Sequence, residues 1–387
     1  MKKIALLIFS LFSLSLAIAQ TSNYWLAKST GKLPMLAYGL GGDRLGGAKM
    51  GYIDTGIVLK IVDSSNGMYK AQLSQYHSAY IEKDYLLKDS SLALKPFYLA
   101  NSWSAKGNDS TDIVSIQVDE KLPYKSWMEI NPNKIMIDLY GVQSNSNWIT
   151  QFTTLREVKN VYFNQVEDDV MRITIELKHK QHWGYAINYR GRSLSIVVKR
   201  PPAKLDIRNL TIAIDAGHGG TNTGAGGIKT KIAEKDYTLK FAKAFEAVLK
   251  RQKIKTIMVR SADTTIDNVN RVLWLQQQNP TLLISFHLNS SGRTEIKGTS
   301  TYYKHIGYRP VTTAILKRML ELGLNEFANV GNFNFMLNAP TDFPNCLVEV
   351  AFLSNEEDEK LIQNPKFHKQ VAQKVYAGIN DWLKQLK

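Results

Sequence analysis

The sequence predicts a multidomain protein in which a β-rich N-terminal region precedes an α/β domain with a mostly parallel sheet flanked by helices. The chain has 387 residues, which is enough for two or three domains. Up to about residue 200, short runs alternate between apolar and polar residues, as half-buried strands do. Beyond Pro201 and Pro202, which we interpret as a short linker, continuous apolar runs alternate with helical spacing. This second pattern favours a sheet that is covered by helices on both faces.

Residues 1–19 have the pattern of a secretory signal peptide. Lys2 and Lys3 precede the apolar run Ile4 to Leu16, and Ala17-Ile18-Ala19 follows as a cleavage site of the A-x-A kind. The run is short for a membrane span, so we prefer a signal peptide to a membrane anchor. No second run of spanning length follows. We therefore expect an exported chain without a membrane span, located in the periplasm or at the cell wall.

The composition restricts the partners of the chain. Its formal net charge is +15, which suits an anionic polymer of the cell envelope, although solubility alone would explain it equally well. Nucleic acid is a poorer match, because the lysines are spread along an exported chain. Cys346 is the single cysteine, so no internal disulfide can form, and we expect it to be a small core residue.

Residues 34–88 are expected to form a small β-barrel. Asn66-Gly67 lies between two alternating apolar runs, which is a strong hairpin signal. This turn, the Met68-Tyr69 pair after it and the closing segment Tyr80 to Leu86 resemble a bacterial SH3-type barrel. Any other small β-barrel would leave a similar pattern.

Residues 96–200 are expected to form a β-sandwich, because alternating runs of this kind are typical of half-buried antiparallel strands. The runs are 112–118, 134–142, 158–166, 170–177 and 193–199. Their order and the segment "IMIDLYG" resemble the AMIN domain of cell-wall amidases. The resemblance implies that this region targets the envelope. It has no cluster of metal ligands, so we expect a fragment starting near Leu205 to fold, bind metal and act by itself. The alternative is that the two halves share a core.

Four residues of the α/β region can bind a metal or transfer a proton, and they lie at or near the ends of predicted strands or at a helix start. His218 follows the apolar run in "TIAIDAGHGG", His287 ends "LLISFH", Glu349 lies inside "CLVEVAF", and Glu234 lies where a loop turns into a helix. In open α/β sheets, functional sites gather at the carboxyl ends of the strands. Two histidines and one carboxylate are a common set for catalytic zinc, and a further carboxylate can act as a general base.

These residue types alone leave other interpretations open. A histidine after a strand is more often a capping or packing residue, and a glutamate at a helix start often interacts with the helix dipole. A carboxylate inside an apolar strand, such as Glu349, is costly unless it is paired or functional. The remaining histidines lie in polar or β-rich contexts, and we expect them at the surface: His77, His179, His182, His305 and His368.

The region 208–387 resembles the zinc N-acetylmuramoyl-L-alanine amidases in four segments. These are "IDAGHGG", "GGIKTKIAEKDYTL", "VRSADTTIDNVNRVLWLQQQNPTLLISFHLNS" and "PNCLVEVAFLSNEEDEKLI". The resemblance implies that His218, Glu234 and His287 bind zinc and that Glu349 is the catalytic carboxylate. Asn289 is expected near the ligands or the substrate. Residues 304–334 match only loosely, and we find no extra helix that would plug the site.

The activity implied is hydrolysis of the amide between the lactyl group of N-acetylmuramic acid and L-alanine of the peptidoglycan stem peptide. A non-catalytic cell-wall binding protein would lack one of the site residues, and none is missing. A zinc peptidase that acts on stem peptides is a second alternative. The sequence leaves open whether an activator protein is a further partner. Arg271 is expected to form a salt bridge within the domain rather than to orient substrate.

Overall fold

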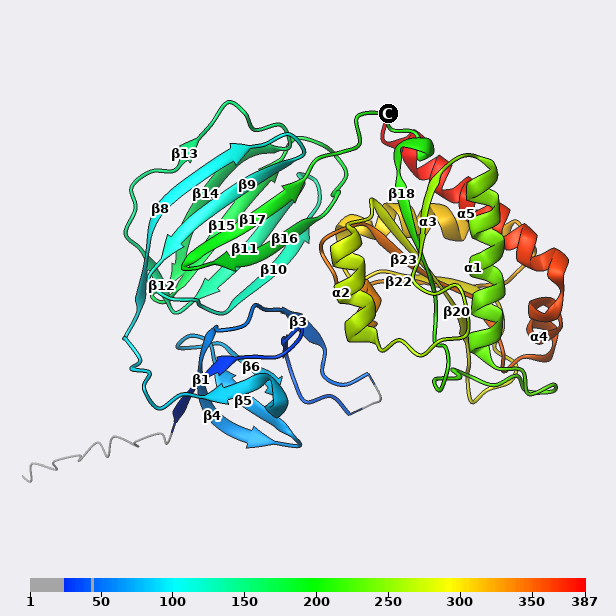
Figure 1. The fold of residues 1–387 in the computed structure, drawn as a ribbon, viewed down its shortest axis with the longest axis horizontal. Helices are drawn as coiled ribbons and strands as arrows, with labels where there is room; N and C mark the ends of the chain where they lie inside the picture. Colours follow the sequence, from blue (N-terminus) through cyan, green and yellow to red (C-terminus); the bar gives the residue numbers. More distant parts are fainter. Residues whose placement is uncertain (1–23, 43–44) are drawn as a thin grey trace, which may run out of the picture.

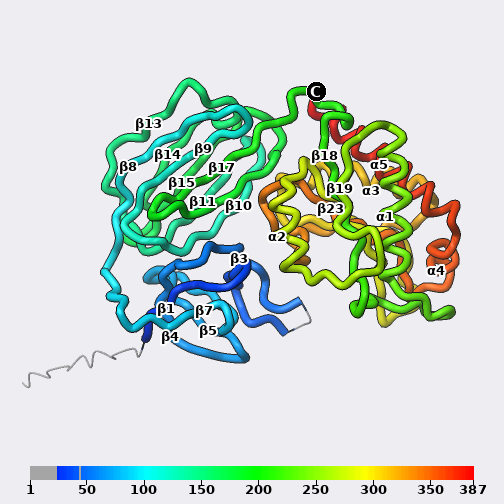
Figure 2. Tube along the Cα trace, viewed as in Figure 1, coloured from blue at the N-terminus to red at the C-terminus, as the bar shows by residue number. Residues whose placement is uncertain are grey.

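The computed structural model describes residues 24–42 and 45–387, which form three units (Figure 1). The expected signal peptide, residues 1–19, lies outside the described residues. The two β-rich units lie one above the other beside the α/β unit (Figure 2). Within the described part of the chain, no helix is long and apolar enough to cross a membrane.

The first unit is a seven-stranded antiparallel sheet with the strand order β3-β2-β6-β5-β4-β1-β7. Asn66 and Gly67 join β4 to β5 at φ values of 47° and 77°, as a type I′ hairpin turn requires. The expected start at residue 34 was too late, because β1 pairs with both β4 and β7. The strands are β1 (Trp25–Ser29), β2 (Met35–Ala37), β3 (Lys49–Tyr52), β4 (Val58–Ser65), β5 (Met68–Gln72), β6 (Ser78–Glu82) and β7 (Leu86–Lys88).

The second unit contains two sheets, with the orders β10-β11-β15-β14 and β12-β8-β9-β17-β16. Most pairings are antiparallel, whereas β12 and β13 run parallel to β8. Inward residues of both sheets, such as Ile116 and Ile137, belong to one buried core. The strands are β8 (Tyr98–Gly107), β9 (Thr111–Val118), β10 (Tyr124–Glu129), β11 (Lys134–Tyr140), β12 (Val142–Ser144), β13 (Thr150–Gln151), β14 (Val158–Glu167), β15 (Val170–Leu177), β16 (Tyr185–Arg190) and β17 (Ser193–Lys199).

The third unit has a six-stranded sheet with the order β19-β18-β20-β23-β21-β22. We expected a mostly parallel sheet; the sheet is mixed, because β21 runs antiparallel to β23 while the other pairings are parallel. Its strands are β18 (Thr211–Ala216), β19 (Lys255–Met258), β20 (Leu282–Asn289), β21 (Thr299–Tyr302), β22 (Glu326–Val330) and β23 (Asn345–Phe352). Its helices are α1 (Glu234–Arg251), α2 (Asn268–Gln278), α3 (Arg309–Leu320), α4 (Glu356–Gln363) and α5 (Pro365–Gln385).

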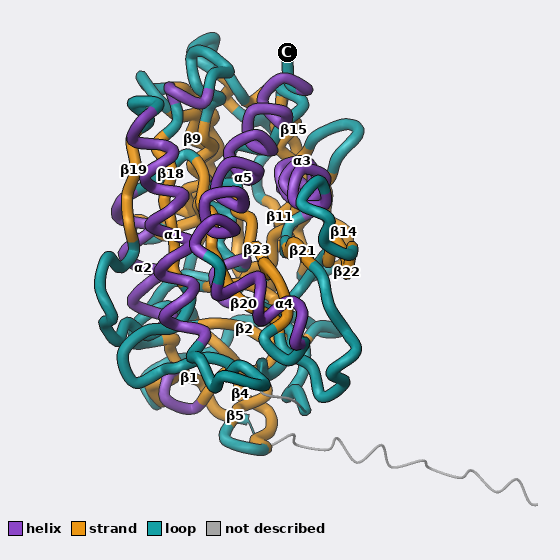
Figure 3. Tube along the Cα trace, turned by 90° about the vertical axis from the view of Figure 1, so that its right-hand side faces the viewer, coloured by secondary structure: helices purple, strands orange, loops and turns teal. Residues whose placement is uncertain are grey.

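Helices cover both faces of this sheet. Ile212 and Ile214 of β18 belong to a core with residues of α1, α3 and α5, which lie together in front of the strands in Figure 3. Ala213 points the other way and packs with Val272 and Leu275 of α2. This alternation is why the β18 sequence reads as a continuous apolar run.

The second and third units are tightly docked. Trp183 of the sandwich lies against Trp382 of α5, with 5.3 Å between the ring centroids. Gln181 accepts a hydrogen bond from the Trp382 indole at 3.0 Å and donates one to the Gly307 carbonyl at 2.7 Å. Tyr308 of the third unit belongs to the core of the N-terminal region. The two-proline linker therefore joins units that share buried side chains.

The expectation that all five remaining histidines lie at the surface was wrong for three of them. His182 is 1% exposed, His368 is buried and His305 is half-buried. Each of the three donates a ring N–H to a backbone carbonyl, which satisfies its polar edge inside the protein. Cys346 is buried, as expected.

Candidate metal centre

His218 lies in a loop whose backbone passes close to the second histidine. The loop begins where β18 ends, and His218 has a φ of 62°. A Cβ atom on Gly217 would come within 2.3 Å of the His287 ring, so a glycine is required there. The glycines around the histidine thus let two parts of the site approach each other.

Three side chains from separate elements converge at this point. His287 lies near the end of β20, which is the parallel neighbour of β18, and Glu234 is the first residue of α1. Glu234 Oε1 lies 3.0 Å from His218 Nε2 and 3.1 Å from His287 Nδ1. The three donor atoms lie within 4.8 Å of one another, so that this group could hold a metal ion.

Backbone and side-chain contacts fix the orientation of the group. Glu234 is 4% exposed and accepts backbone N–H groups from Ala225 at 2.8 Å and Leu288 at 3.0 Å. His218 donates from Nδ1 to Asn222 Oδ1 at 2.9 Å, which leaves Nε2 facing Glu234. Burial alone would raise the pKa of Glu234, but the two histidines hold it well below its ordinary value.

The donor set fits a zinc-type ion. Two imidazole nitrogens and one carboxylate oxygen match the ligands of catalytic zinc sites, which keep a fourth position for water or substrate. The His218 and His287 side chains remain 20% and 19% exposed, so a substrate can reach them.

Glu349 lies beside this group without belonging to it. It is 6% exposed on β23, directly across from His287 in the strand register. Burial and then the charge of Glu349 raise the pKa of Tyr302, whose strand borders β23 on the other side. Asn289 ends β20 and lies 3.4 Å from the Tyr302 hydroxyl, at a hollow of about 320 Å³.

Two arginines that support the histidine loop are buried. Arg271 donates to Asp215 and to the His218 carbonyl, which confirms the expected salt bridge within the domain. Arg260 donates to the Ala216 and Gly217 carbonyls at 2.8 Å and 2.9 Å. The acid in "IAIDAG" was the sequence signal for this support, because an acid at the end of an apolar strand needs a buried partner.

Sequence reasoning missed the helix residue that holds the loop before α1. Glu359 of α4 accepts from the Lys229 and Thr230 backbone N–H groups at 2.9 Å and 3.0 Å and from the Thr230 hydroxyl at 2.6 Å. This loop leads into Glu234. In the sequence Glu359 is one of four acids at a helix start, and nothing there separates it from the others.

An aromatic loop, residues 331–336, forms another wall of the site. The Phe335 ring is nearly parallel to the His287 ring, with the centroids 6.4 Å apart. Phe335 also lines a cavity of about 80 Å³ together with both histidines and Arg271. This loop overlaps the stretch of loose sequence resemblance, so its place at the site could not be predicted from the sequence.

The chain is similar to known cell-wall amidases. Residues 212–381 match the N-acetylmuramoyl-L-alanine amidase family model, and residues 103–198 match the AMIN domain model. The probable cell wall amidase LytH of Staphylococcus aureus is 28% identical over 184 residues, which are 47% of this chain and 61% of LytH. The chain therefore matches less than two thirds of the length of these curated relatives.

Two solved structures are similar to the third unit. One is the catalytic domain of CwlV, an N-acetylmuramoyl-L-alanine amidase from Bacillus (Paenibacillus) polymyxa var. colistinus. It is 32% identical, with 46% of this chain and 99% of that chain covered and a TM-score of 0.43. The other is the N-acetylmuramoyl-L-alanine amidase from Clostridium difficile 630. It is 25% identical, with 46% of this chain and 98% of that chain covered and a TM-score of 0.44.

Proposed function

The chain belongs, through residues 212–381, to the N-acetylmuramoyl-L-alanine amidase family, and from this premise we propose that it is an exported, zinc-dependent peptidoglycan hydrolase. The bond it cleaves joins the lactyl group of N-acetylmuramic acid to L-alanine of the stem peptide. The observation that carries the proposal is the convergence of His218, Glu234 and His287 within 4.8 Å, beside the buried Glu349.

The side chains divide the chemistry between them. A zinc ion held by His218, Glu234 and His287 would supply a Lewis acid that lowers the pKa of water and polarises the amide carbonyl. Glu349 accepts the proton of the attacking water and returns it to the leaving amine nitrogen. Asn289, at the adjoining hollow, contacts the substrate. Arg271 keeps the His218 loop in place through the His218 carbonyl.

The N-terminal region and the charge support a cell-wall location. The AMIN match covers residues 103–198, and the net charge of +15 favours an anionic envelope polymer. We therefore propose that the exported chain acts in the periplasm or at the cell wall, with peptidoglycan as its partner and substrate.

Digestion of purified sacculi with and without a chelator, followed by mass analysis of the products, tests the function. We expect glycan strands that keep their lactyl groups and free stem peptides that begin with L-alanine, and the chelator should stop their release until zinc is added back. Cuts within the stem peptides would identify a peptidase. Binding to sacculi without any release would identify a non-catalytic wall-binding protein.

A further inference from the structure

We propose that the first β-rich unit completes the active-site cleft, because it holds the aromatic loop 331–336 in place beside the candidate metal centre. This inference rests on the proposed amidase function. It makes Asn334, at the middle of the loop, a positioning residue for substrate binding. It also gives the N-terminal region a task within the site in addition to targeting.

The Asn334 side chain is fully engaged by the first unit. Its Oδ1 accepts the Lys49 backbone N–H at 2.9 Å. Its Nδ2 donates to the carbonyls of Leu45, Gly46 and Gly47, at 3.1, 3.3 and 3.0 Å. The Lys49 ammonium group in turn donates to the Asn334 carbonyl at 2.8 Å, and Lys49 is 8% exposed. A hydrogen bond to a buried charged group is stronger than one between neutral groups.

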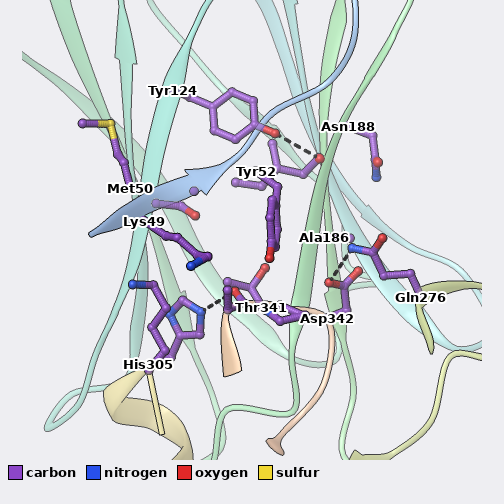
Figure 4. A pocket seen from close by; sticks show the side chains of 16 residues that line it. Lys49, Met50, Tyr52, Tyr124, Ala186, Asn188, Gln276, His305, Thr341 and Asp342 are labelled. Atoms are coloured by element: carbon purple, nitrogen blue, oxygen red, sulfur yellow. Dashed lines mark hydrogen bonds between the residues drawn. The ribbon is translucent and has the colours of Figure 1, made fainter. Parts of the chain in front are cut away.

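A second contact continues the link along the loop. The Tyr52 hydroxyl, also from the first unit, donates to the Met336 carbonyl at 3.3 Å. Figure 4 shows Lys49 and Tyr52 directed into a cavity of about 90 Å³ that His305, Thr341 and Asp342 of the third unit also line. The first unit therefore contacts the loop at Asn334 and at Met336, the residues before and after Phe335.

The loop has little regular structure of its own. β22 ends at Val330, and the short 3-10 helix η4 (Met336–Asn338) begins six residues later. Between them the Phe333 N–H donates to the carbonyl of Tyr303, the residue after β21, at 3.2 Å. The position of the intervening residues therefore depends on aromatic packing and on the bonds made by Asn334.

The neighbours of Asn334 in the chain form the wall of the cleft. Phe333 and Phe335 have ring centroids 4.5 Å apart, and both contact Tyr302, at 4.9 Å and 5.3 Å. Phe335 lies along His287 at the edge of the metal-ligand group. Because both histidine side chains keep about a fifth of their surface exposed, the loop forms a side wall for a bound muropeptide rather than a plug.

Releasing Asn334 should weaken substrate binding without disturbing the metal. The three donor side chains come from the loop after β18, from α1 and from β20, and none lies on the aromatic loop. If the loop occupies the bound position only a tenth of the time, the apparent affinity for substrate falls about tenfold. Such a loss appears in KM, whereas kcat follows from the residues that touch the reacting bond.

The test uses the full chain with Asn334→Ala, and with Lys49→Met as a second variant from the other side of the contact. The matched controls are Asn332→Gly, an exposed residue of the same loop whose φ of 51° glycine tolerates, and Lys70→Met on β5. Hydrogen exchange of residues 331–337, zinc content and the hydrolysis of a soluble muropeptide are measured. For Asn334→Ala we expect exchange about tenfold faster, a KM about tenfold higher, kcat within about twofold and unchanged zinc.

Two results would overturn the inference. One is unchanged exchange in Asn334→Ala, because the loop would then not depend on the first unit. The other is faster exchange with an unchanged KM, because the loop would then not belong to the cleft. Hydrogen exchange does not depend on turnover. A wild-type chain that leaves muropeptides intact would therefore count against the proposed amidase function, while the exchange data would still judge the link through Asn334.

Discussion

His218 has a backbone conformation that residues other than glycine rarely adopt, and its neighbours enforce it. Arg271 binds its carbonyl, and Asn222 binds its ring from the side away from the site. Gly217 leaves room for the His287 ring. A residue held in an unfavourable conformation by several contacts is typical of a functional site.

Replacing Gly217 with alanine should therefore weaken metal binding. The new Cβ would lie 2.3 Å from the His287 ring, so that the ring must move out of the donor group. We expect zinc affinity to fall by about 10- to 100-fold, as with other changes next to metal ligands. Gly226→Ala is the matched control, because a Cβ there has no atom within 4 Å. Competition with a chromophoric chelator measures both, and equal affinities would contradict the prediction.

Glu349→Gln should separate catalysis from metal binding. The amide keeps the shape of the side chain but cannot accept the proton of water, so we expect kcat to fall by about 10²- to 10⁴-fold. Glu349 is not one of the three converging donors, so zinc content should stay the same. Elemental analysis alongside the rate assay checks both parts. Loss of zinc together with activity would make Glu349 a ligand.

At the scale of single elements, helix α4 holds in place the loop that precedes Glu234, because Glu359 accepts its backbone N–H groups. Glu359→Gln replaces one of the two accepting oxygens with an NH2 group, so that one of the backbone N–H groups of Lys229 and Thr230 loses its acceptor and the other keeps only a weaker, neutral one. We expect about 1–3 kcal/mol less stability for this loop and faster tryptic cleavage at Lys229 and Lys231. Glu357→Gln on the same helix is the control, because its ion pair with Lys297 is exposed, contributes little and does not involve this loop. Equal cleavage of the two variants would refute the role of Glu359.

Elements with a regular pattern were predictable from the sequence, and those with an interrupted pattern were not. The five expected sandwich strands correspond to β9, β11, β14, β15 and β17. β8 was missed because its register shifts between Ala100 and Trp103, which breaks the alternation of buried residues. For the site, the strand ends indicated His218 and His287, and the structure places their ring centroids 4.9 Å apart. The link from Lys49 to Asn334 spans 285 residues, so no local pattern could reveal it.

For the whole molecule, the interface histidine His182 should make stability depend on pH. Burial lowers its pKa from 6.5 to about 4, so the folded chain keeps it neutral while the unfolded chain protonates it below about pH 6.5. The full free energy of unfolding is therefore available above that pH. It decreases by up to about 3 kcal/mol as the pH falls towards 4, because only the unfolded chain binds the proton.

Denaturant unfolding at pH 7.5 and pH 4.5, with chelator in all samples, measures this effect. His182→Gln should lose less stability between the two pH values than the wild-type chain does. His77→Gln, at a histidine whose side chain is 39% exposed, is the control for the same substitution outside this interface. The same loss in His182→Gln as in the wild type would show that this histidine is not responsible.

The docked units favour the alternative in which the two halves of the chain depend on each other. A fragment starting near Leu205 would uncover Tyr308 and Trp382, which are both 0% exposed in the full chain. We now expect this fragment to melt at a lower temperature and to bind muropeptide more weakly than the full chain does. Equal melting temperatures and KM values would restore the initial expectation of an independent domain.

The contact between Trp183 and Trp382 allows the interface between the second and third units to be monitored by spectroscopy. The two indoles lie 5.3 Å apart, at 44° to each other, and come from different units. Transitions in rings this close couple, so the pair should give a near-ultraviolet circular dichroism signal that disappears when the units separate. Separation of the units would also expose both indole rings to water and shift their fluorescence emission to longer wavelengths. The pair is thus an intrinsic optical reporter among the seven tryptophans of the chain, and the difference from a Trp183→Phe chain isolates its signal, so that opening of the joint can be followed without any attached dye.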